Sequence, residues 1–164
     1  MTYNKEALNV IETLQSTINN EKFQDEILNI AHLIKKINND GKITAIFGNG
    51  GSASDAQHFA AELVCTYKDR DRKPYRAIAL TTDTSIITAW SNDFEYESIF
   101  ARQLNAFENN IGLVIGLSTS GKSKNVLRAL EYSKKINCTT CLICGKNELN
   151  YENVDFIIKV PSKD

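Results

Sequence analysis

The sequence KITAIFGNGGSASDAQHFAAEL, residues 42–63, decides the fold that this chain can adopt. The apolar run 43–47 lies between two glycines and predicts a buried β-strand. Residues 48–54 predict a loop, and from Asp55 onward apolar residues recur at helical spacing. A strand, a glycine loop and a helix in this order can hold an anion, because loop N–H groups and the helix N-terminus both attract it.

Two serines in this loop add to the predicted anion site. Ser52 and Ser54 supply hydroxyl donors and can also cap the helix. The spacing of the glycines is not GxGxxG, so the loop does not indicate a dinucleotide-binding fold.

The composition indicates one ordinary soluble domain. The chain has 164 residues, 42% of them hydrophobic, and a net charge of -1. Interspersed charges of both signs argue against a nucleic-acid surface. The absence of a long apolar run or a signal-peptide core predicts no membrane span and a cytoplasmic location. In that compartment we expect free thiols at Cys65, Cys138, Cys141 and Cys144.

The first part of the chain, residues 4–39, has apolar residues at helical spacing and contains neither Pro nor Gly. Asn19 and Asn20 mark a break between two helices, and Gly41 follows the end of the second. Two amphipathic helices ahead of the first strand predict an oligomer surface on their outer sides.

The rest of the chain alternates strands with helices. Further strands are expected at 76–80, 111–117, 139–144 and 154–160, and further helices from 86, at 96–107 and at 125–135. This alternation predicts an α/β fold with a parallel sheet of about five strands flanked by helices. The whole chain, 1–164, would be a single domain, with the N-terminal helices at 4–39 and an α/β core at 42–162. In such sheets ligands bind at the carboxyl ends of the strands.

A second small-residue loop follows the strand 111–117. Residues 116–123, GLSTSGKS, fit the P-loop pattern GxxxxGK[ST]. A nucleotide site would also need an acidic residue for Mg²⁺, and Asp83 is the only candidate. A nucleotide site would leave the first glycine loop unexplained. A simple phosphate cradle, formed by both loops together, is the interpretation that we favour.

His58 and Glu62 lie four residues apart, on one face of the helix that follows the first loop. They could hold Zn²⁺, or Glu62 could act as a general base. Alternatively, they form a surface pair. Their place one turn after the glycine loop favours a role near a bound phosphate.

Two other patterns are ambiguous in the sequence. Cys138, Cys141 and Cys144 have the spacing of a metal site, but strand alternation would point Cys141 away from the other two, so core thiols are expected. Asn92 and Asp93 predict either a turn or hydrogen-bonding groups at the sheet edge.

Four blocks of the sequence together resemble the phosphoheptose isomerases of the sugar isomerase (SIS) domain superfamily. The first is GNGGSASDAQHFAAEL at 48–63, and the others lie at 79–85, 92–93 and 118–121 in matching order. The resemblance runs from about residue 5 to Ser162. It implies a flavodoxin-like fold and a homotetramer built through the N-terminal helices. It also implies conversion of sedoheptulose 7-phosphate to glycero-manno-heptose 7-phosphate through an enediol.

The resemblance also implies roles for particular residues. Those that would bind the phosphate are Ser118, Thr119, Ser120 and Ser123. Those that would bind the sugar are Asn49, Gly50, Gly51, Ser52, Asn92 and Asp93. His58 and Glu62 would be two ligands of one Zn²⁺ per subunit, and Glu62 would also move a proton between two carbons.

The chain departs from the family pattern in three places. The family continues after the last strand into a helix whose Gln and His resemble the remaining zinc ligands, and this sequence ends at Asp164. Thr66 stands where members often have Arg, and Lys122 where they usually have Asn. The missing ligands keep open a second hypothesis, a non-catalytic SIS module that binds a sugar phosphate or a partner protein of the replication-initiator-associating type.

Overall fold

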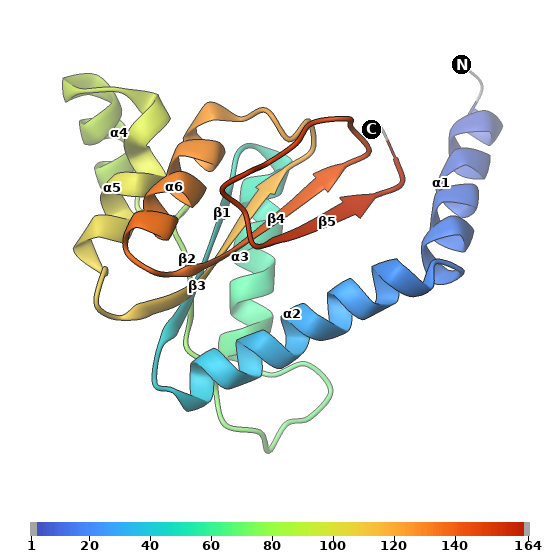
Figure 1. Cartoon of the computed structure of the whole chain (residues 1–164), viewed down its shortest axis with the longest axis horizontal. Coiled ribbons are helices and arrows are strands. Elements are labelled where there is room, and N and C mark those ends of the chain that lie inside the picture. The colour runs from blue at the N-terminus through green and yellow to red at the C-terminus, as the bar shows by residue number, and fades with distance from the viewer. Residues whose placement is uncertain (1–2, 163–164) are drawn as a thin grey trace.

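The computed structural model describes residues 3–162, and it confirms the predicted α/β fold (Figure 1). The helices are α1 Tyr3–Ile18, α2 Glu21–Asn39, α3 Gly51–Val64, α4 Thr84–Asp93, α5 Ile99–Ala106 and α6 Lys124–Lys135, with a 3-10 turn, η1, at Tyr96–Ser98. The strands are β1 Ile43–Gly48, β2 Ala77–Ala79, β3 Ile111–Ser118, β4 Thr139–Gly145 and β5 Phe156–Val160.

The five strands form one sheet in the order β2-β1-β3-β4-β5, and every neighbouring pair is parallel. From β1 the chain goes outward to β2, then returns past β1 to build the rest of the sheet on the other side. The winding therefore reverses between β1 and β3. Gly48 pairs with Leu117, so both strands end level at this switch point, where open α/β sheets bind ligands.

Helices cover both faces of the sheet, and each face has its own apolar core. Neighbouring residues of β1 point to opposite sides, with Phe47 packed under α5 and α6 and Ile46 packed under α2 and α3. Phe47 stacks on Phe100 of α5 at a ring distance of 4.9 Å. Because β1 and β3 are buried on both faces, they appear in the sequence as nearly continuous apolar runs.

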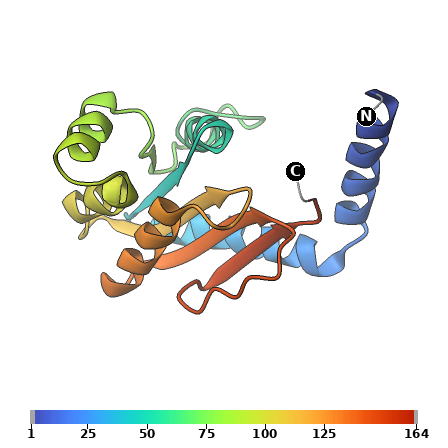
Figure 2. The same ribbon diagram turned by 90° about the horizontal axis from the view of Figure 1, so that it is seen from above.

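Helix α1 stands away from the sheet in both views (Figures 1 and 2). The predicted break before α2 is confirmed, and Asn20 caps α2 by accepting a hydrogen bond of 3.1 Å from the N–H of Phe23. Large apolar side chains on α1 are exposed: Leu8, Val10, Ile11, Leu14 and Ile18. No helix in the described residues, α1 included, is long and apolar enough to span a membrane.

Two helix boundaries differ from the prediction. Helix α3 begins at Gly51 rather than Asp55, because Gly50 takes a positive φ of 57° and lets the chain turn at once into the helix. Ser52 and Ser54 lie inside the first turn, and the N-cap has no side-chain hydrogen bond, so neither serine caps the helix. Helix α4 begins at Thr84, two residues before the expected start at 86, and continues through Asp93.

Candidate active site

The two small-residue loops lie side by side because β1 and β3 are neighbours. At Gly48 a side chain would be impossible: a Cβ there would lie 2.8 Å from the Cβ of Ser52 and 2.9 Å from the carbonyl oxygen of Leu117. The glycine therefore lets the end of β1 approach both α3 and β3. Its effect is to bring the N-terminus of α3, with its unpaired N–H groups, next to the loop that follows β3.

The loop after β3 carries several hydroxyls, and some of them hydrogen-bond within the loop. Ser118 is buried, and its Oγ donates to Ser123 Oγ at 2.9 Å and accepts from the N–H of Ser123 at 3.4 Å. Ser120 Oγ accepts from the N–H of Lys122 at 3.2 Å. Thr119 and Ser120 are exposed. The loop leads into the N-terminus of α6, which also attracts an anion.

The loop after β1 carries the residues expected to bind the sugar. Gly50 and Gly51 are exposed at the start of α3, and Ser52 is half-buried behind them. Asn49 is half-buried and is held by polar side chains of two other elements, Asn125 of α6 and Tyr96 of η1. Neither Tyr96 nor Asn125 was predicted from the sequence, since single polar residues in amphipathic helices carry no signal of this contact.

Asn92 and Asp93 lie at the exposed C-terminal end of α4, where Asn92 Nδ2 donates to Asp93 Oδ1 at 2.9 Å. In the described residues no hydrogen bond joins either side chain to the two loops. Tyr96 lies three residues after Asp93, and its hydroxyl hydrogen-bonds Asn49 of the first loop. The hydrogen bond from Tyr96 to Asn49 therefore connects this segment with the first loop.

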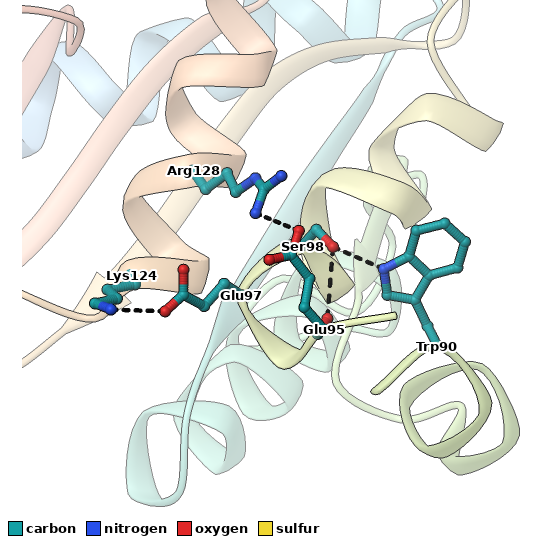
Figure 3. A network of polar contacts seen from close by, with 6 residues as sticks. All are labelled: Trp90, Glu95, Glu97, Ser98, Lys124 and Arg128. Atoms are coloured by element: carbon teal, nitrogen blue, oxygen red, sulfur yellow. Dashed lines mark hydrogen bonds and ion pairs between the residues drawn. The ribbon is translucent and has the colours of Figure 1, made fainter. Parts of the chain in front are cut away.

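A polar network holds α4 and η1 against α6 (Figure 3). Trp90 Nε1 donates to Ser98 Oγ at 2.8 Å, Glu95 pairs with Arg128, and Glu97 pairs with Lys124 at 2.8 Å. The hydrogen bond with Glu97 raises the pKa of Lys124. These pairs fix the position of the segment that carries Asn92 and Asp93 relative to the helix of the hydroxyl loop.

His58 and Glu62 lie on one face of α3 as predicted, with His58 Nε2 3.9 Å from Glu62 Oε1. The His58 side chain is 78% exposed and that of Glu62 is 38% exposed, but Glu62 Oε2 is buried and has no hydrogen-bond partner within residues 3–162. Ser91 Oγ is the other buried side-chain oxygen without a partner there. A buried polar atom without a partner is unfavourable unless a ligand, a metal, a water or a proton satisfies it.

A His nitrogen and a carboxylate oxygen on one helix face fit the donor chemistry of zinc. The described residues contain no group of three or more His, Cys, Asp or Glu side chains arranged to hold a metal. Zinc usually takes four ligands, so His58 and Glu62 by themselves would not complete its coordination.

The nucleotide hypothesis loses support in the structure. Asp83, the candidate Mg²⁺ ligand, accepts the N–H of Ile86 at 3.0 Å as the N-cap of α4. The strand β3 also extends through Ser118, so the first residues of the GLSTSGKS pattern form strand rather than loop. Lys122 is exposed in the remaining short loop.

The cysteine pattern forms no metal site. Cys138 and Cys144 belong to the core under α5 and α6, and Cys141 to the core on the other face, as strand alternation predicts. All three are buried free thiols. Burial raises the pKa of Cys141 to about 12, so this thiol stays protonated.

Comparison with known proteins agrees with this geometry. A family model described as the SIS domain matches residues 2–145. A phosphoheptose isomerase of Helicobacter pylori (strain P12) is 46% identical over 162 residues, covering 98% of this chain and 82% of the relative. The chain belongs to the phosphoheptose isomerase family. A relative of the same name from Clostridium acetobutylicum is 39% identical over 155 residues, covering 94% of this chain and 79% of that protein.

Solved structures of the family have the same fold. A phosphoheptose isomerase from Francisella tularensis superposes with a TM-score of 0.84 at 28% identity, covering all of this chain (100%) and 88% of that one. One from Neisseria gonorrhoeae gives a TM-score of 0.75 at 31% identity, covering 97% of this chain and 85% of that one. The family resemblance inferred from the four sequence blocks is thus confirmed over the described fold.

Proposed function

We propose that this chain isomerises sedoheptulose 7-phosphate to D-glycero-D-manno-heptose 7-phosphate. The observation that carries the proposal is that the two small-residue loops meet at the neighbouring ends of β1 and β3, with Glu62 on the helix that leads away from the first loop. A phosphate cradle and a carboxylate that can act as a base are what an aldose–ketose isomerase needs. The relatives that match most of the chain are phosphoheptose isomerases.

The phosphate would bind in the loop after β3. Ser118, Thr119, Ser120 and Ser123 offer hydroxyl and backbone donors there, and the N-terminus of α6 adds its partial positive charge. Asn49, Gly50, Gly51 and Ser52 would contact the sugar chain, with Asn92 and Asp93 at its far side. The hydrogen bonds of Ser118 with Ser123 and of Ser120 with Lys122 already hold the loop in shape, so less ordering is needed on binding.

Glu62 would move the proton. Its carboxylate removes a proton from C1 of the open-chain ketose, and the C–H electrons form the C1–C2 double bond of an enediolate. The same carboxylate then returns the proton to C2, while the O1 hydroxyl proton is lost and O2 gains one, which leaves the carbonyl at C1. One base can serve both carbons because they are adjacent.

We further propose that zinc takes part. His58 and Glu62 would hold it together with ligands from outside residues 3–162, and it would supply Lewis-acid stabilisation of the enediolate oxygen. The unpartnered Glu62 Oε2 and the His–Glu donor chemistry support this proposal.

The proposed assembly is a homotetramer built through the N-terminal helices. Leu8, Ile11, Leu14 and Ile18 recur at spacings of three and four, so they form one stripe on α1 that its own chain leaves exposed. A contiguous apolar stripe on a helix that projects from its own domain favours burial against copies of itself. The product would feed heptose precursors for lipopolysaccharide or other surface sugars, and a cytoplasmic location agrees with four free thiols.

The alternative of a non-catalytic SIS module is not favoured, because the matching relatives are named phosphoheptose isomerases. The deciding experiment is conversion of sedoheptulose 7-phosphate by the purified chain, with and without added Zn²⁺. Zinc-dependent turnover is the expected result. Saturable binding without turnover in either condition would contradict the proposed activity and leave a binding module.

A further inference from the structure

Three polar side chains from separate elements meet behind the first glycine loop. Asn49 follows β1, Tyr96 belongs to η1, and Asn125 lies in the first turn of α6. Asn125 is only 3% exposed, which is unusual for an amide side chain near a helix terminus. Neither Tyr96 nor Asn125 has a part in the mechanism above, so their contact with Asn49 needs an explanation.

The orientation of the Asn125 amide is fixed by the backbone. Its Oδ1 accepts the N–H of Val126 at 3.0 Å, and a backbone N–H can only donate, so the oxygen of the amide must face it. The same oxygen accepts from Asn49 Nδ2 at 2.9 Å, and Asn125 Nδ2 donates back to Asn49 Oδ1 at 2.9 Å. Turning either amide over would place donor against donor and acceptor against acceptor. The fixed backbone of α6 therefore dictates which way Asn49 faces.

Tyr96 completes the assignment. Its hydroxyl donates to Asn49 Oδ1 at 2.8 Å, so this oxygen accepts two hydrogen bonds, one for each lone pair. The amide nitrogen of Asn49 has two hydrogens, and one of them goes to Asn125. In the described part of the chain this leaves Asn49 with one N–H and no spare acceptor.

We propose that Asn125 and Tyr96 are positioning residues that make Asn49 a donor-only contact for the sugar. Asn49 then recognises a substrate oxygen through its lone pair and rejects a donor at the same place. The inference rests on the proposed function for the nature of the ligand. Because Asn125 lies two residues after Ser123, the same pair also sets the distance between the sugar contact and the phosphate loop.

A double-mutant cycle tests the coupling. Asn49→Ala and Asn125→Ala should each lower kcat/KM for sedoheptulose 7-phosphate about 10- to 100-fold, as misplaced contacts do. If Asn125 acts through Asn49, the double variant should be no worse than Asn49→Ala alone, within about twofold. A fall equal to the product of the two single effects would overturn the proposal.

Tyr96→Phe with Asn49→Ala gives a second double-mutant cycle. Tyr96 is 52% exposed, so its substitution does not change a buried residue. This substitution should cost about three- to tenfold in kcat/KM in the wild type and nothing in the Asn49→Ala background. The matched control is Tyr132→Phe, which removes a hydroxyl that hydrogen-bonds Asn105 and Glu108 at a different place and should leave kcat/KM unchanged. A cost of Tyr96→Phe that persists in the Asn49→Ala background would overturn the proposal.

Asn49→Asp tests the donor directly, because its carboxylate keeps the shape and lacks the N–H. It should be as impaired as Asn49→Ala, and near-normal kcat/KM would contradict a donor-only role. Failure of the proposed function is distinguishable, since the wild type would then not convert sedoheptulose 7-phosphate, whether or not it binds the sugar. If the wild type converts this sugar but the effects in both double-mutant cycles are additive, the proposed function stands and only the positioning role is refuted.

Discussion

The hydroxyl of Tyr151 donates a hydrogen bond of 3.2 Å to the carbonyl oxygen of Gly121, across 30 residues of chain. Burial raises the pKa of Tyr151, so this hydroxyl keeps its proton near neutral pH. The contact fixes the hydroxyl loop after β3 against the connection between β4 and β5. It also fills the space beside Gly121, where a Cβ would lie 1.9 Å from the Tyr151 hydroxyl oxygen.

Gly121→Ala should therefore disrupt the loop. Gly121 has a φ of +68°, which costs an alanine about 1–2 kcal/mol, and the clash with Tyr151 adds to this. We expect a lower free energy of unfolding in urea and at least tenfold weaker binding of the sugar phosphate. Gly41→Ala is the control, because Gly41 also has a positive φ of 72° but has nothing within 4 Å of a Cβ. Equal effects of both variants on sugar-phosphate binding would contradict the role of the loop.

Glu62→Gln should abolish most turnover while leaving the fold intact. The change removes the base, so kcat should fall about a hundredfold or more. The one ion pair of the Glu62 side chain in the described residues is its 3.9 Å contact with the exposed His58, so the thermal midpoint should not fall. The exposed Glu131→Gln is the control for the assay. Near-normal kcat in Glu62→Gln would sink the assignment of Glu62 as the base.

Lys122→Asn separates the isomerase from a P-loop enzyme. Lys122 is exposed, so its contribution to phosphate binding is screened by solvent, and kcat should stay within about threefold of the wild type. Titration calorimetry should show no ATP binding that depends on Lys122, so the wild type and Lys122→Asn should give the same result. Lys35→Asn on α2 serves as the control. Lys122-dependent ATP binding would instead support the nucleotide hypothesis.

The charge of Asp155 should make the free energy of unfolding depend on pH. Burial acts to raise its pKa, but hydrogen bonds from Lys134 and from the backbone and hydroxyl of Thr140 outweigh it, and the pKa lies below the usual value. The folded state therefore favours the ionised form of Asp155. Its contribution to the free energy of unfolding is present above the unfolded pKa of about 3.9, and it is lost as the pH falls through the lower folded pKa.

The measurement compares Asp155→Asn with the wild type in urea unfolding at several pH values. The variant should be less stable by about 1–3 kcal/mol at pH 7. The difference should shrink below about pH 4 as the wild-type carboxylate gains its proton. Asp25→Asn, an exposed change on α2, is the control. A difference that stays constant between pH 7 and pH 3 would show that the charge of Asp155 is not what stabilises the fold.

Ile11→Glu with Leu14→Glu should break the proposed tetramer. Both residues lie on the exposed apolar stripe of α1, and a carboxylate cannot be buried there without a partner. Light scattering after size-exclusion chromatography should give a smaller molar mass for the variant than for the wild type. The far-ultraviolet circular dichroism should be unchanged. Asn9→Glu, on the opposite side of the same helix, should keep the wild-type mass. A wild type that is already monomeric would refute the tetramer.

Much of the fold could be predicted because it is encoded locally. The apolar run 43–47, the small residues after it and the repeating pattern up to Leu63 predict a strand, a loop and a helix by their periods alone. Alternation in the same way predicted that Cys141 faces away from Cys138 and Cys144, and the two cores confirm it. The boundaries failed where a local exception acted, as at Gly50, whose positive φ started α3 early.

The sequence by itself determined the parallel α/β sheet, the two small-residue loops and the His58–Glu62 face, since each depends on spacing within one element. Only the tertiary structure decided that Asn49 meets Asn125, 76 residues away, and that Tyr96 satisfies the same oxygen. It also decided that one oxygen of Glu62 is buried without a partner in the described residues. Such relationships depend on which strands become neighbours and in what register, and no local period records them.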